Sequence, residues 1–208
     1  DRKISVNPVL HSFQMVVNQY SIDTHLIDKF LQSMEQDLDD IHYSNDAYKD
    51  YIVGSAEVVG LMCLKVFVNG NEKLYKNLED SARRLGAAFQ KINFLRDVKA
   101  DYKELGRTYF PGVDLDKFTR IEKLKIEADI QEDFKYALEG IVKLPSSSRL
   151  GVYVAYRYYF SLFKKIKKIS SERLMKERIR VPTTRKLDIT FDSIFQNRFD
   201  CIWSTYLS

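Results

Sequence analysis

SARRLGAAFQKINFLRDVKAD, residues 81–101, is the most informative segment of the chain. Apolar residues recur in it at every third or fourth position, the spacing of a helix. Gln90, Asn93, Asp97 and Asp101 fall within an arc of about 80° if each residue turns the helix by about 100°. Because apolar side chains cover much of the remaining surface, this helix should be enclosed, with its polar stripe facing an internal cavity.

The same helical spacing runs through the rest of the chain, and no stretch alternates convincingly at period two. Two clear stripes consist of Ile27, Phe30, Leu31, Met34 and Leu38, and of Ile130, Phe134, Leu138 and Ile141. Asn7 before Pro8 is typical of a helix start, and Asn69-Gly70 fits a helix end better than a hairpin. We predict an all-α fold with helices at about 8–19, 23–41, 45–68, 72–102, 119–143, 148–168, 171–178 and 184–206.

Length and composition favour one globular domain that works in a reducing compartment. The chain has 208 residues, of which 45% are hydrophobic, enough for one substantial core. Cys63 and Cys201 cannot form a disulfide framework, and the three histidines lack partners at zinc-ligand spacing. The longest apolar run, residues 58–68, contains Lys65 and is far shorter than the ~20 residues of a membrane span. We expect a cytoplasmic protein.

Positive charge is concentrated in the last third of the chain. The net charge is only +4, but residues 143–188 contain thirteen Lys or Arg against three acids. This pattern indicates a basic surface or an anion site. Lys164, Lys165, Lys167 and Lys168 would suit a peripheral contact with an anionic membrane surface, although a solvated helix face is the simpler explanation.

Asp97 and Asp101 lie one helical turn apart and should repel each other unless a cation compensates. The cation could be Lys99 on a solvated face, and DxxxD spacing alone does not exclude that reading. The pair also suits Mg²⁺, which prefers one or two carboxylates plus water and phosphate oxygens. Hydrogen-bond donors for an anion lie close by in the sequence, at Arg96, Arg107 and Tyr109. A magnesium-bound diphosphate therefore fits both the carboxylate pair and these donors.

Two blocks of sequence resemble a known family. LGAAFQKINFLRDVKADYKELGRTYFP, residues 85–111, resembles the second aspartate-rich signature of squalene/phytoene synthases, and DYIVGSAEVVGLMCLKVF, residues 50–67, is similar to their small-residue helix. The resemblance implies an isoprenoid synthase fold, a helical bundle around a central cavity. It also implies a Mg²⁺-dependent head-to-head condensation of two prenyl diphosphates through a cyclopropyl intermediate.

The resemblance also implies roles for individual residues. Asp97 and Asp101 would hold Mg²⁺ on a substrate diphosphate, and Gln90 and Asn93 would line the same cavity. Arg96 would steady the signature helix. The family pattern further implies that Tyr51 contacts diphosphate or intermediate, that Arg178 binds diphosphate, and that Tyr159 lies near the active centre, where core packing is the alternative.

Two departures from the family pattern limit this transfer. Glu57 stands where the family has glycine, and a buried glutamate needs a partner. The first aspartate-rich motif is absent from the 208 residues. We therefore expect one isoprenoid synthase domain, incomplete at its N-terminus and inactive alone. The GRTYFP loop resembles the bacterial carotenoid type, which favours phytoene as product and no NADPH step.

Two other functions compete with this interpretation. The fold is also used by a non-catalytic assembly factor that resembles these synthases, and fold alone does not fix function. Tyrosines at positions 153, 156, 158 and 159 amid lysines could suggest nucleic-acid binding. Because they share a helical span with apolar residues, several of them should be buried, and we expect no nucleic-acid partner.

Overall fold

The computed structural model describes residues 5–38, 45–105, 109–113, 118–198 and 202, with the backbone alone at 45, 100, 101 and 103–105. Its helices are α1 (Pro8–Tyr20), α2 (Thr24–Gln36), α3 (Asn45–Ile52), the π-helical η1 (Val53–Glu57), α4 (Val58–Phe67), α5 (Glu72–Leu105), α6 (Arg120–Ile141), α7 (Ser146–Lys167), α8 (Ser171–Leu174) and α9 (Thr183–Arg198). Among the described residues no strand occurs. The predicted all-α class is confirmed.

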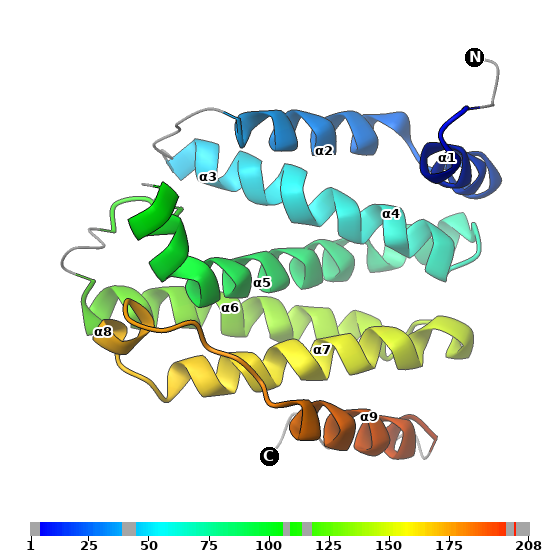
Figure 1. Ribbon diagram of the computed structural model, residues 1–208. Coiled ribbons are helices and arrows are strands. Elements are labelled where there is room, and N and C mark those ends of the chain that lie inside the picture. Colours follow the sequence, from blue (N-terminus) through cyan, green and yellow to red (C-terminus); the bar gives the residue numbers. More distant parts are fainter. Residues whose placement is uncertain (1–4, 39–44, 106–108, 114–117, 199–201, 203–208) are drawn as a thin grey trace.

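Helix α5 is the centre of the bundle (Figure 1). It packs on one side against α3, η1 and α4, and on the other against α6 and α7. The outer helices then cover these neighbours, because α2 lies on η1 and α4, and α9 lies on α7. The signature stretch recognised in the sequence therefore runs through the middle of the protein.

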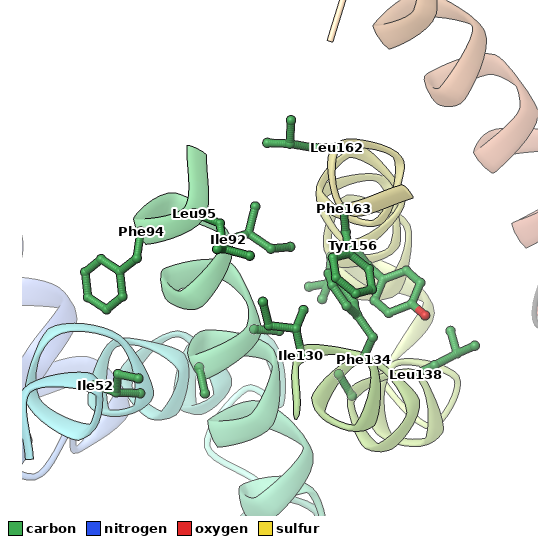
Figure 2. Packing of buried hydrophobic residues seen from close by; sticks show 14 of the residues in the cluster. Ile52, Ile92, Phe94, Leu95, Ile130, Phe134, Leu138, Tyr156, Leu162 and Phe163 are labelled. Carbon is green, nitrogen blue, oxygen red and sulfur yellow. The ribbon is translucent and has the colours of Figure 1, made fainter. Parts of the chain in front are cut away.

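The largest part of the core lies between α5, α6 and α7. Ile130 and Phe134 of α6 are fully buried, as are Tyr156 and Phe163 of α7. Figure 2 shows Phe134 and Tyr156 pointing toward each other, with their ring planes at 85°. The predicted stripe on residues 130–141 is thus confirmed, and so is the burial of several tyrosines.

Helix α2 differs from its predicted stripe. Leu31 and Leu38 are exposed, while Leu26 and Ser33 are buried. The reason is a close approach to η1, where a Cβ on Gly54 would lie 2.7 Å from the Cβ of Ser33. Two helices can come this close only if the residues between them are small. The contact face of α2 therefore carries Ser33, whereas hydrophobic periodicity predicts a large apolar residue on the buried face. The helix also ends at Gln36, earlier than predicted.

The predicted helix over residues 45–68 is continuous but changes its winding at η1. Two glycines let it lie close to α5. A Cβ on Gly60 would lie 2.6 Å from the carbonyl oxygen of Ala82, and one on Gly86 would lie 2.5 Å from that of Ala56. Both distances are too short for a real contact. Tight helix packing therefore accounts for these small residues.

Asn69 and Gly70 end this helical run. Both residues have positive φ angles, 51° and 71°, and the amide of Gly70 donates to the carbonyl of Lys65 over 3.1 Å. This 6→1 hydrogen bond, from the amide of one residue to the carbonyl five positions before it, is typical of a Schellman motif. The predicted helix end is confirmed.

Replacing Gly86 by alanine should strongly destabilise the protein. The new methyl would overlap the Ala56 carbonyl in the backbone of η1. Overpacking of this kind costs about 1–3 kcal/mol, and the upper end applies where backbone must move. The matched control is Gly151→Ala on α7, where a Cβ meets nothing within 4 Å and alanine should gain up to about 1 kcal/mol. Urea unfolding of both variants provides the measurement, and equal effects would contradict the prediction.

Candidate functional site

Asp97 is held by two arginines. The Nε of Arg178 lies 2.6 Å from Oδ1 of Asp97, and the Nη2 of Arg96 lies 2.5 Å from Oδ2. The hydrogen bond to Asp97 raises the pKa of Arg96 above its usual value. Three residues proposed from the sequence are therefore brought together, although Arg178 lies 81 positions away from Asp97.

Arg178 comes from the irregular segment that links α8 to α9. Leu174, Ile179 and Val181 are buried and anchor this segment. Ser170 caps α8 by accepting a hydrogen bond from the amide of Arg173. The anchors fix the backbone, so the Arg178 side chain can reach the end of α5 from a defined position.

Asn93 and Tyr159 also meet. The hydroxyl of Tyr159 donates to Oδ1 of Asn93 over 3.4 Å, and its ring stacks on Phe89 with centroids 3.9 Å apart. Asn93 lies one turn before Asp97 on α5. Tyr159 thus borders the polar stripe, and its place near an active centre stays a prediction. Phe89 is an aromatic neighbour that the sequence analysis does not single out.

An elongated apolar cavity of ≈ 380 Å³ begins at this stripe. Its wall residues come from η1, α4, α5, α6 and α7. Gln90 and Phe89 lie where the stripe begins, Phe67 is the last residue of α4, and Leu144 follows the end of α6. Cys63 lies on this wall and is exposed. The lining is predominantly hydrophobic, so the cavity suits a hydrocarbon chain whose polar head lies toward Gln90.

Tyr51 belongs to a different cluster. It is buried, and its hydroxyl donates to both carboxylate oxygens of Asp37 over 2.9 and 3.1 Å. Its ring lies 6.0 Å from that of Phe94 and 5.9 Å from that of Tyr109. Contact between Tyr51 and a diphosphate stays a prediction. Asp37, at the end of α2, was missed in the sequence because no periodic pattern marks a residue just past a helix.

The described donors fit part of a magnesium site. Asp97 and Asn93 offer hard oxygen atoms, and Mg²⁺ normally completes such a set with water and phosphate oxygens. Asp101 lies within α5, but its side chain falls outside the described residues. In the part of the chain that the structure describes, no group of three or more His, Cys, Asp or Glu could hold a metal ion.

A second charged cluster lies between α5 and α6. Asp133 is buried and accepts from Arg84 over 2.8 Å and from Lys91 over 2.7 Å. Burial acts to lower the pKa of Lys91, but Asp133 and Asp129 hold it above its usual value. The sequence carried a usable signal: Arg84 and Lys91 lie two turns apart on α5, and Asp129 and Asp133 lie one turn apart on α6.

Glu57 has the partner that the sequence required. Arg83 lies 3.6 Å from its carboxylate. Burial raises the pKa of Glu57, while Arg83 acts in the opposite direction. The glutamate lines a cleft of ≈ 820 Å³ together with Asp133 and Lys91, and it is not part of the wall of the apolar cavity.

None of the helices in the described ranges combines the length and hydrophobicity needed to cross a membrane. The sequence led to the same expectation for residues 58–68.

Comparisons with known proteins agree with the architecture. The chain is 26% identical over 196 residues to a bifunctional lycopene cyclase/phytoene synthase of Phycomyces blakesleeanus, covering 84% of this chain and 32% of that relative. It thus spans about a third of the relative's length. A crystal structure of a dehydrosqualene synthase in complex with ligand superposes with a TM-score of 0.77 and 19% identity, covering 94% of this chain and 72% of the other. That likeness shows the fold.

The family is shown by a broader match. The sequence profile described as squalene/phytoene synthase matches residues 1–185. This range contains the small-residue helix, the polar stripe of α5 and Arg178. The chain therefore belongs to the squalene/phytoene synthase family.

Proposed function

We propose that this chain binds a magnesium-chelated prenyl diphosphate and serves a transferase that condenses two such substrates head to head. The observation that carries the proposal is the junction of a polar cluster with an apolar cavity along α5. Asp97 and Arg178 lie at the polar end, and Gln90 marks the start of the cavity. This arrangement suits a ligand that has a diphosphate head and a hydrocarbon tail.

The polar end would act on the diphosphate. Asp97 would hold Mg²⁺ together with Asp101, and Arg178 and Arg96 would donate to phosphate oxygens. When bound, Mg²⁺ would neutralise the charge that develops on a departing diphosphate. Asn93, positioned by Tyr159, adds a neutral oxygen on the same face of α5. The protein groups therefore orient the head and favour its departure.

The apolar end would hold the prenyl tail away from water. Its volume falls within the ~300–1,000 Å³ that small-molecule sites usually occupy. The stacked rings of Phe89 and Tyr159 lie where tail and head would join. An aromatic face there can stabilise an allylic cation through cation–π attraction.

The substrate we favour is geranylgeranyl diphosphate, which two successive steps would convert to phytoene. The first step joins two molecules as a cyclopropyl diphosphate, releasing one diphosphate and one proton. The second step releases the other diphosphate, rearranges the skeleton and loses a proton, with no reduction. The phytoene synthase part of the Phycomyces relative's name supports this choice.

The test supplies geranylgeranyl or farnesyl diphosphate with Mg²⁺ to the full-length protein and extracts the hydrocarbon. We expect phytoene from the C20 substrate and no requirement for NADPH. Folded protein that yields no coupled product from either substrate would contradict the transferase and favour the non-catalytic alternative.

Cys63 gives an independent readout of tail binding. In a Cys201→Ser background, prenyl diphosphate with Mg²⁺ should slow labelling of Cys63 by a maleimide, because the tail would cover the cavity wall. Inorganic pyrophosphate serves as the control, since it occupies the head position only and should leave the labelling rate unchanged. Equal protection by both ligands would contradict tail binding in this cavity.

A further inference from the structure

Asp97 cannot be shared freely between an arginine and a metal ion. Oδ1 accepts from Nε of Arg178 over 2.6 Å, and Nη2 of the same residue lies 3.4 Å from Oδ2. Arg96 donates to both oxygens, with Nη2 2.5 Å from Oδ2 and Nε 3.1 Å from Oδ1. A divalent cation on either oxygen would therefore meet at least one guanidinium at close range, and like charges at such distances repel.

Arg96 and Arg178 differ in how easily their side chains can move away from the Asp97 carboxylate. The Arg96 side chain is 22% exposed and lies beside Asp97 on the same helix, whereas the Arg178 side chain is 52% exposed and comes from an irregular segment. Buried Leu174 and Ile179 hold the backbone on either side of the exposed residues 176–178. Arg178 can thus turn away by rotation of its side chain alone, without movement of a helix.

A diphosphate resolves the competition, because it supplies negative oxygens to both cations at once. The planar guanidinium of arginine matches phosphate as well as carboxylate. When Mg²⁺ carries a diphosphate to Asp97, the donors of Arg178 can pass from the carboxylate to the phosphate and remain paired. Mg²⁺ without the anion would leave Arg178 unpaired beside a second positive charge.

We propose that Arg178 is a positioning residue that excludes free Mg²⁺ from Asp97 and admits the ion only together with a diphosphate. This inference rests on the proposed function, since it assigns an order of events to the same site. It predicts opposite changes in two affinities when the arginine is removed, a pattern that neither a structural ion pair nor a simple phosphate ligand would give.

The experiment compares Arg178→Gln with wild-type protein by calorimetric titration of the full-length chain. Mg²⁺ alone should bind about ten-fold more tightly to the variant, because a hydrogen-bonded competitor is lost. Inorganic pyrophosphate in the presence of Mg²⁺ should bind about ten-fold more weakly, because its arginine is lost. Arg178→Lys, which keeps the charge but not the fork, should change both affinities in the same directions by less.

Arg180→Gln is the matched control. It removes the same charge two residues away, and Arg180 is exposed. The hydrogen bond that the backbone carbonyl of Arg180 accepts from Lys165 over 2.7 Å does not depend on the substituted side chain. Both affinities should stay within about two-fold of wild type. If Arg178→Gln strengthens or weakens both ligands together, or changes neither, the inference is overturned. Wild-type protein that binds no pyrophosphate with Mg²⁺ would overturn the proposed function as well.

Discussion

Replacing Asp97 by asparagine should reduce head-to-head condensation by about 100-fold or more, the usual cost of losing one preorganised electrostatic group at a reacting centre. Asparagine keeps the shape of the side chain but cannot neutralise Mg²⁺. It also leaves Arg178 and Arg96, both now within 2.6 Å of the carboxylate, without their anion. The turnover number should fall more than the apparent affinity for substrate, since the tail still has its cavity.

A binding measurement separates this role from a structural one. In the variant, the gain in pyrophosphate affinity that Mg²⁺ provides should disappear, while metal-free pyrophosphate should bind at least as well as to wild type, because two arginines are released. Asp188→Asn, on an exposed position of α9, is the control and should retain full activity. Normal activity in Asp97→Asn would remove Asp97 from the proposed site.

The bundle could be predicted because helical periodicity is a local property. The stripe on α6 and the burial of Tyr153 and Tyr156 follow from spacing, and the structure confirms them. The residue size that a close helix contact requires is not a local property, because it depends on a segment that is distant in the sequence. Ser33 is buried and Leu31 exposed because Gly54 of η1 comes within contact of α2, which the pattern on α2 does not reveal.

The candidate site could be predicted in part for the same reason. Gln90, Asn93 and Asp97 share one face of α5, so their common orientation was evident from spacing. Arg178 was placed only through family resemblance, since nothing local connects it with Asp97. The structure supplies the ion pair between them, so Asp97 is not a free carboxylate.

The Asp133 cluster, like the candidate site, could be predicted from the sequence only in part. Four charges on α5 and α6 have suitable spacings, but spacing does not tell which of two carboxylates is buried. The Asp133 side chain is 1% exposed and that of Asp129 is 51% exposed, although both lie within 2.7 Å of the Lys91 amine. This difference in burial gives the two residues very different expected effects.

Asp133→Asn should lower the free energy of unfolding by about 1.5–3 kcal/mol, the range for hydrogen bonds to charged groups, because a buried carboxylate that accepts from two cations is lost. Lys91 would retain only the half-exposed Asp129, and Arg84 would lose its partner altogether at this position. Urea denaturation provides the measurement. If the slope of the unfolding free energy against urea concentration is unchanged, the variant differs from wild type in stability alone.

Asp129→Asn is the matched control on the same helix and the same lysine. Water can replace its exposed carboxylate, so the loss should stay below about 1 kcal/mol. Replacing both members of the buried pair, as in Lys91→Met with Asp133→Leu, should recover most of the stability, because no charge then remains buried alone. Arg84 can turn outward in that variant, since its side chain is 44% exposed. Equal losses from the two single aspartate variants would show that burial does not set the strength of this cluster.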